Sequence, residues 1–130
     1  MASIFTKIIN GEIPCNKISE NEKFIAFLDV FPLVMGHVLI VPKKETDYIF
    51  DIDDAELAEM MVFAKQIAKA IKSAVPCKRI GVAVIGLEVP HAHIHLVPMN
   101  SANDVNFTQA KLSPSKEELS EVAIKIKSFL

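Results

Sequence analysis

Apolar and polar positions repeat with two different periods along this chain, and each change of period marks a boundary between elements. Between residues 51 and 75 the apolar side chains recur at three- and four-residue steps, which places them on one face of a long helix. Short runs of aromatic and aliphatic residues elsewhere are typical of strands. The pattern predicts a helix at 3–11, strands at 24–30 and 37–42, a helix at 51–75, strands at 80–85 and 91–97, and a last helix after 113.

Residues that favour helix ends stand where the expected helices begin. Ser3 and Asp53 are good N-cap residues, because their side-chain oxygens accept hydrogen bonds from backbone N–H groups that have no partner within the helix. Ser113 followed by Pro114 fits a cap with proline at the first helical position. Residues 100–112 are polar and lack a period, so we expect a loop there.

The order of these elements predicts the fold class. A helix, two strands, a long helix, two strands and a final helix are typical of an α+β domain with an antiparallel sheet. Half of the 130 residues are hydrophobic, so we expect one domain over residues 1–130. Met60 and Met61 are expected in its core, with a partner interface as the alternative. With Val62 they make the helix face so wide that we also expect a homodimer.

Charge and hydropathy argue against several functional classes. The formal net charge is −2 and no basic run exceeds Lys43-Lys44, which argues against nucleic acid as a partner. No apolar stretch approaches the ~20 residues that cross a bilayer. Residues 1–14 lack the apolar block of a signal peptide, so we expect a cytoplasmic protein without a membrane partner. Cys15 and Cys77 are expected as reduced thiols, although a disulfide stays open.

Three of the four histidines, His91, His93 and His95, occupy alternate positions. In an extended strand they would share one face, while Ala92 and Ile94 between them would enter the core. One interpretation is chance placement on a half-exposed strand. A second is a metal site, although alternate residues lie roughly 7 Å apart and would strain to reach one ion. The third is covalent catalysis, because a neutral imidazole is a nucleophile near pH 7 and its neighbours can neutralise phosphate oxygens.

The segment His-Ala-His-Ile-His-Leu-Val at 91–97 resembles the signature of the histidine triad (HIT) superfamily. Residues 3–14 are similar to the amino-terminal helix of its Hint-like branch, and residues 27–44 are similar to that branch's first two strands. The resemblance implies a HIT-like antiparallel sheet with one long packed helix and short terminal helices. It also implies a homodimer in which the two sheets become continuous.

The resemblance further implies a nucleotide-binding hydrolase or transferase. Such proteins cleave at the α-phosphate of a purine nucleotide, such as a nucleoside phosphoramidate, through a covalent nucleotidyl-histidine intermediate. His93 would be the nucleophile, and the backbone carbonyl of His91 would orient its ring. His95 and His37 would surround the phosphate, and Asp29 would hold the ribose. The side chains implied to enclose the base, unless they only form core, are Ile4, Phe5, Ile8, Phe27, Leu28 and Val30.

The chain departs from the family pattern in three places. Many relatives carry two cysteines of a structural zinc site where this chain has Ser3 and Thr6, so we expect no metal and no cofactor. Leu87 and Glu88 occupy a shortened turn before the triad, where Gln and a hydroxyl donor are usual. Glu88 is expected beside the nucleotide, where a carboxylate repels phosphate unless it is protonated or paired. The segment after Pro98 lacks the tryptophan-containing tail of Hint proteins.

Three alternatives to a phosphoramidase therefore stay open. The unusual turn favours a dinucleoside polyphosphate hydrolase, which would use the same histidines on a different leaving group. A non-catalytic nucleotide-binding regulatory module would bind AMP without turnover. A metal-binding protein would use the histidines as ligands, and metal analysis of protein purified without a histidine tag distinguishes it.

Overall fold

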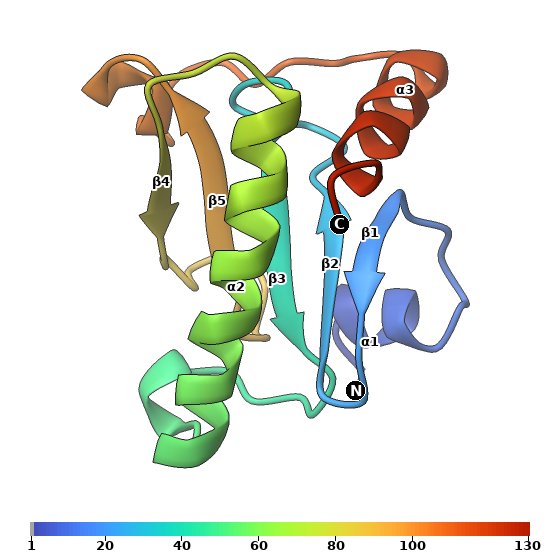
Figure 1. The fold of residues 1–130 in the computed structure, drawn as a ribbon. Coiled ribbons are helices and arrows are strands. Elements are labelled where there is room, and N and C mark those ends of the chain that lie inside the picture. Colours follow the sequence, from blue (N-terminus) through green and yellow to red (C-terminus); the bar gives the residue numbers. More distant parts are fainter. Residues whose placement is uncertain (1) are drawn as a thin grey trace.

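The computed structural model describes residues 2–130, and its centre is a five-stranded antiparallel sheet (Figure 1). The strand order is β1-β2-β3-β5-β4. The strands are β1 (Lys17–Glu20), β2 (Phe24–Leu28), β3 (Val38–Pro42), β4 (Arg79–Ala83) and β5 (Ile94–Met99). The helices are α1 (Ile4–Ile9), α2 (Asp54–Ala74) and α3 (Lys116–Lys127), with short 3-10 turns η1 (Ile49–Asp51) and η2 (Ala102–Val105). The α+β fold class is confirmed.

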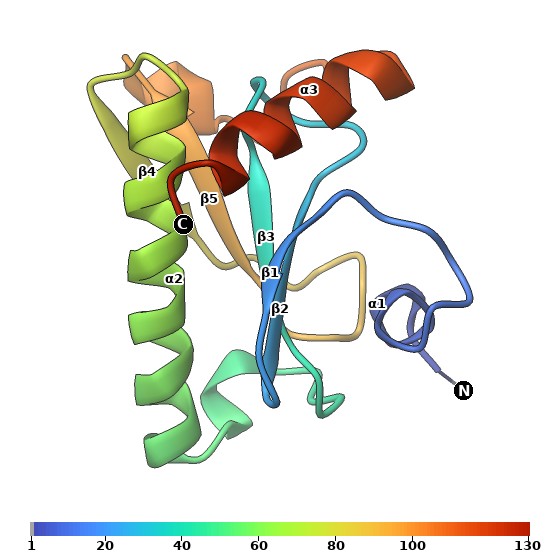
Figure 2. The same ribbon diagram turned by 45° about the vertical axis from the view of Figure 1, so that its right-hand side comes forward.

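Two different sets of helices cover the two faces of the sheet (Figure 2). Residues of α2 and α3 form one core with the sheet, and α1 packs on the opposite face, where the rings of Phe5 and Phe27 meet edge to face. Because both faces are covered, β2 and β3 are buried at every position instead of alternating. Met60 lies in the core as expected, whereas Met61 is 51% exposed. No helix within residues 2–130 is long and apolar enough to span a membrane.

Side-chain caps begin all three α-helices. Ser3 and Asp53 accept hydrogen bonds from backbone N–H groups of α1 and α2, as expected. The start of α3 differs, because Ser115 and not Ser113 is its cap. Glu118 stands three residues after Ser115 and its carboxylate accepts a bond from the Ser115 N–H, which completes a reciprocal capping box. No glutamate stands three residues after Ser113.

The sequence pattern missed the edge strand β1. Only Ile18 of its four residues is buried, and the other three are lysine, serine and glutamate, which have low strand propensity. The segment is a strand because it pairs with β2, where Glu20 lies opposite Ile25. A strand that buries one side chain gives almost no hydrophobic period.

The prediction of an extended strand from His91 onward was wrong at its beginning. The strand β5 begins at Ile94, and its pairing with β3 ends there. Before that point the Ala92 N–H donates to the Thr46 carbonyl in the loop after β3. The expected core face is confirmed, because Ala92, Ile94 and Leu96 are all buried on the α2 side of the sheet.

Candidate active site

A cavity of about 630 Å³ lies on the α1 side of the sheet, between α1, the end of β2, the turn before β5 and the segment after η2. Its volume falls in the range of small-molecule binding sites. The cavity brings together His93, His95 and Glu88 with six of the seven residues that the resemblance assigned to the base and ribose, which are Ile4, Phe5, Ile8, Phe27, Asp29 and Val30. The seventh, Leu28, borders the cavity, but its side chain is 2% exposed and is buried in the core on the α2 side of the sheet, so its expected place in the base wall was wrong.

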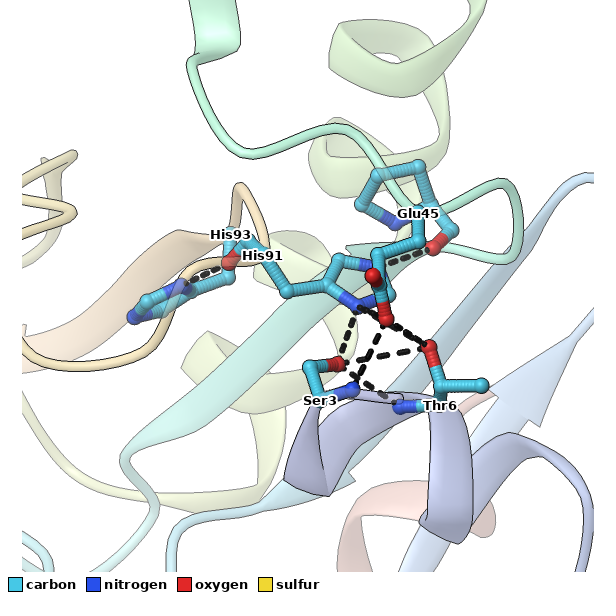
Figure 3. Close-up of polar contacts among 6 residues, drawn as sticks. Ser3, Thr6, Glu45, His91 and His93 are labelled. Carbon is cyan, nitrogen blue, oxygen red and sulfur yellow. Dashed lines mark hydrogen bonds and ion pairs between the residues drawn. The ribbon is translucent and has the colours of Figure 1, made fainter. Parts of the chain in front are cut away.

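The ring of His93 has a defined proton position. Its Nδ1 lies 2.8 Å from the backbone carbonyl oxygen of His91 (Figure 3). A carbonyl only accepts hydrogen bonds, so Nδ1 carries the proton and Nε2 carries the free lone pair. Burial lowers the pKa of His93 below its ordinary value, against the opposing effect of the bond to His91, so the ring is neutral near pH 7. A neutral imidazole with a free lone pair is chemically a nucleophile.

His37 and His95 form a directional pair beside it. The N–H of Leu33 donates to Nδ1 of His37 at 3.1 Å, so the proton of neutral His37 is on Nε2. That Nε2 lies 2.9 Å from Nδ1 of His95, which must accept, so the proton of His95 is on its Nε2. Burial lowers the pKa of His37 to about 4 and of His95 to about 3. Near pH 7 His95 therefore offers an N–H donor to a ligand while remaining neutral.

Charged groups surround this pair. Asp29 follows β2, and its Oδ2 lies 3.9 Å from Nε2 of His37. Burial raises the pKa of the Asp29 carboxyl, while its hydrogen bond from the Phe31 N–H opposes that shift. Lys111 lines the same cavity, and its positive charge contributes to the lowered pKa values of His37 and His95. The exposed Glu88 also lines the cavity, so it faces the same ligand space as Lys111.

Among residues 2–130, Asp29, His37 and His95 are the one group placed to hold a metal ion, with ligand atoms within 4.8 Å of one another. A nitrogen ligand needs a free lone pair. Metal binding would therefore require His37 to lose the Nε2 proton that it donates to His95. With that proton in place the pair is arranged to donate a hydrogen bond to an anion.

His91 is placed differently from the other triad histidines. Its ring is 0% exposed and does not line the cavity. Its Nε2 lies 2.7 Å from the Pro42 carbonyl oxygen, and its Nδ1 lies 2.7 Å from the Ser3 hydroxyl. The resemblance assigned a role only to the His91 backbone carbonyl, whereas the structure also gives both nitrogens of its ring hydrogen-bond partners.

Residues 100–112 contribute to the cavity, although their polar sequence without a period predicts only a loop. The centre of the Phe107 ring lies 4.7 Å from the centre of the His95 ring. Lys111, which follows in the sequence, lines the cavity. The Leu112 N–H donates to the Pro32 carbonyl at 2.9 Å, which fixes this segment to the loop after β2. The hydrophobic pattern of this segment has no period that would indicate its place beside the cavity. The features that could have indicated it are its one aromatic residue, Phe107, and its one lysine, Lys111.

The sequence and the fold of the chain match those of known proteins. The sequence profile of the HIT domain matches residues 10–102. The chain belongs to the HIT family. It is 35% identical over 131 residues to an uncharacterized HIT-like protein of Methanocaldococcus jannaschii, which covers 92% of this chain and 97% of that protein.

Two further HIT relatives are informative. Adenosine 5′-monophosphoramidase HNT1 of Saccharomyces cerevisiae is 41% identical over 98 residues, which is 75% of this HIT protein and 62% of the yeast chain. The crystal structure of a Hit-like protein from Bartonella henselae, which holds an unknown ligand, superposes with a TM-score of 0.85 at 32% identity. That alignment covers 98% of this chain and 96% of the other.

Proposed function

We propose that this HIT protein is a nucleotide hydrolase that cleaves a bond at the α-phosphate of a purine nucleoside phosphoramidate through a covalent intermediate on His93. Membership of the HIT family and the similarity to a yeast adenosine 5′-monophosphoramidase support the class of reaction. The observation that carries the proposal is the pair of proton positions in one cavity. His93 offers a lone pair and His95 offers an N–H, and the centres of the two rings are 4.7 Å apart.

The proposed reaction has two displacements. In the first, Nε2 of His93 attacks the α-phosphorus and the bond between phosphorus and the leaving nitrogen breaks. The leaving amine keeps the electron pair and takes a proton from a water molecule, which becomes hydroxide. The imidazolium that forms is stabilised by the His91 carbonyl, which already accepts its Nδ1–H. His95 donates to a non-bridging phosphate oxygen. In the second displacement water attacks the phosphorus and gives a proton to that hydroxide, the electron pair of the bond to His93 returns to Nε2, and AMP leaves.

The apolar part of the cavity supports the choice of a nucleoside ligand. Phe5 and Phe27 contact each other on the wall that α1 and β2 form, and Ile4 and Ile8 also line the cavity. A flat base is held well between such side chains. Asp29 follows β2 and lines the same cavity, and we expect its carboxylate to accept hydrogen bonds from the ribose hydroxyls.

Lys111 favours a second candidate substrate, a dinucleoside polyphosphate. Hydrolysis of such a substrate releases an anionic phosphate, whereas a phosphoramidate releases an amine. A nearby cation stabilises an anionic leaving group far more than a neutral one. Among residues 2–130 no ion pair includes Lys111, so its charge is available to an anionic group in the cavity.

We also infer that the protein acts as a homodimer through β4 and α2. The strand β4 is at the edge of the sheet, so its outer backbone groups are free to pair with a second copy. Val82 on β4 and Met61 on α2 are about half exposed and line a groove of about 510 Å³ with Tyr48 and Phe50. Two antiparallel β4 strands related by a twofold axis would bury this apolar surface in a self-complementary contact.

The decisive experiment compares wild type and His93→Ala. We expect His93→Ala to lower AMP release from adenosine 5′-phosphoramidate by several orders of magnitude, because no other group supplies the free imidazole lone pair. AMP affinity by calorimetry should remain, because base and ribose contacts are elsewhere. A quench with labelled substrate should leave acid-labile, base-stable label on His93.

The matched control is Cys77→Ser, because Cys77 is a free thiol that does not line the cavity. Its turnover should equal that of wild type. Near-normal turnover by His93→Ala would rule out the covalent route. AMP binding without turnover of either substrate by wild type would instead favour a regulatory module.

A further inference from the structure

A polar cluster lies beside the cavity, at the ring of His91 (Figure 3). Ser3 and Thr6 belong to the first turn of α1, and Glu45 lies in the loop after β3. His91 precedes β5, so three segments that are distant in sequence meet here. Neither Ser3 nor Glu45 lines the cavity.

The Pro42 carbonyl sets the direction of every hydrogen bond at the ring. Because this carbonyl only accepts, Nε2 of His91 carries the proton at 2.7 Å. Nδ1 of neutral His91 therefore accepts, and its donor is the Ser3 hydroxyl at 2.7 Å. The same Ser3 oxygen accepts the Thr6 N–H at 3.0 Å, so it both caps α1 and fixes His91.

Glu45 completes the cluster. Its Oε1 accepts from the backbone N–H of Ser3 at 2.8 Å and from the Thr6 hydroxyl at 2.6 Å. These bonds lower the pKa of Glu45 to about 2, with the bond from Thr6 as the largest cause, so the carboxylate stays ionised. The carboxylate thereby holds the first turn of α1 against the loop after β3.

One hydrogen bond separates this cluster from the proposed nucleophile. The carbonyl of His91 accepts the Nδ1–H of His93 at 2.8 Å. Phe5, on the helix that Glu45 holds, contacts both rings edge to face, with ring centres 5.8 Å from His91 and 4.9 Å from His93. A shift of His91 or of α1 would therefore rotate the His93 ring.

We propose that Ser3 and Glu45 are positioning residues for the reaction on His93, because together they hold His91 so that its carbonyl directs Nε2 of His93 into the cavity. This inference rests on the proposed function of His93. A misplacement of about 1 Å at a reacting group costs roughly 100-fold in rate. Neither side chain lines the cavity, so we expect the effect on kcat to exceed the effect that a shift of Ile4 and Phe5 has on nucleotide binding.

The kinetic test uses Ser3→Ala and Glu45→Ala with adenosine 5′-phosphoramidate as substrate. We expect each to lower kcat by about 10- to 100-fold and to change KM and AMP affinity by a smaller factor. Ser3→Thr and Glu45→Gln retain the hydroxyl and the accepting oxygen, so they should recover most of the activity. Lys7→Ala, at an exposed position of α1, is the matched control and should equal wild type.

A second readout does not depend on turnover. Nitrogen-15 NMR of the imidazoles should show the Nε2–H form for His91 and the Nδ1–H form for His93. In Ser3→Ala the His91 Nδ1 signal should shift to that of a nitrogen without a hydrogen bond, and the Nδ1–H form of His93 should lose population.

The two readouts separate the possible failures. An unchanged kcat in folded Ser3→Ala and Glu45→Ala, or a raised KM at unchanged kcat, overturns the positioning role. Unchanged NMR signals of His91 and His93 in Ser3→Ala also overturn the positioning role. An active His93→Ala refutes the proposed reaction on His93 instead, and this result does not depend on the NMR spectra. If Ser3→Ala does not fold, Glu45→Ala decides the matter, since its side chain is 38% exposed and leaves no buried gap.

Discussion

Acidification from pH 7 to about pH 4.5 is expected to destabilise the fold through His37 and His95. In the folded state burial holds their pKa values at about 4 and about 3, whereas an unfolded histidine titrates near 6.5. The unfolded chain therefore binds more protons between these values. Because the two pKa values are lower in the folded state than in the unfolded state, the free energy of unfolding has its full value above about pH 6.5. It decreases as the pH falls toward the folded pKa values.

The size of the effect follows from these shifts. Each pKa unit corresponds to about 1.4 kcal/mol, so at about pH 4.5 each of the two rings lowers the free energy of unfolding by about 2.5 kcal/mol. Together they remove about 5 kcal/mol, which is comparable with the whole stability of a small domain. The lowered pKa of His93 acts in the same direction. The pKa of Asp29 is raised in the folded state, so protonation of this carboxyl opposes the loss of stability at the acid end of this range.

Urea unfolding followed by circular dichroism at both pH values measures this difference. The carboxylates of Glu20 and Glu45, with pKa values lowered to about 2, stay ionised in the folded protein throughout the range. His37→Asn is the matched variant, and we expect its loss of stability on acidification to be about half that of wild type. An equal free energy of unfolding at the two pH values would refute the assignment of two neutral buried rings.

The remaining predictions concern assembly and substrate. Sedimentation at micromolar concentration should give a dimer for wild type and a monomer for Val82→Lys, because a charge on the exposed face of β4 opposes burial against its copy; a wild-type monomer would refute the interface. Lys111→Met should slow hydrolysis of a diadenosine polyphosphate more than that of adenosine 5′-phosphoramidate, because only the first leaving group is anionic; equal effects in the two assays would exclude leaving-group stabilisation by Lys111.

Much of the fold could be predicted from local pattern. The helical period gave α2, and runs of apolar residues gave β2 and β3, because these elements bury many side chains and so carry a strong signal. The strand β1 could not be found in this way, since it buries only Ile18. The start of β5 was placed too early because the contact between Ala92 and Thr46 is made with a distant loop.

The candidate site shows the same division between local and tertiary information. Spacing and resemblance identified the histidines and part of the cavity lining, but not the proton positions on the rings. Those depend on Leu33 for His37 and on Pro42 for His91, which are backbone partners that carry no side-chain signal. Lys111 was missed for a related reason, since its segment reaches the cavity through tertiary contacts, which are the packing of Phe107 on His95 and the hydrogen bond from the Leu112 N–H to the Pro32 carbonyl.

The cluster of Ser3, Thr6, Glu45 and His91 also limits how the chain can evolve. Loss of the Ser3 hydroxyl alone leaves a buried nitrogen of His91 without its donor, and loss of Glu45 alone leaves the Ser3 N–H without its acceptor. A single mutation at either position therefore passes through a less favourable intermediate. These positions are expected to be inherited as a set, so that lineages exchange the whole arrangement together and seldom exchange one member.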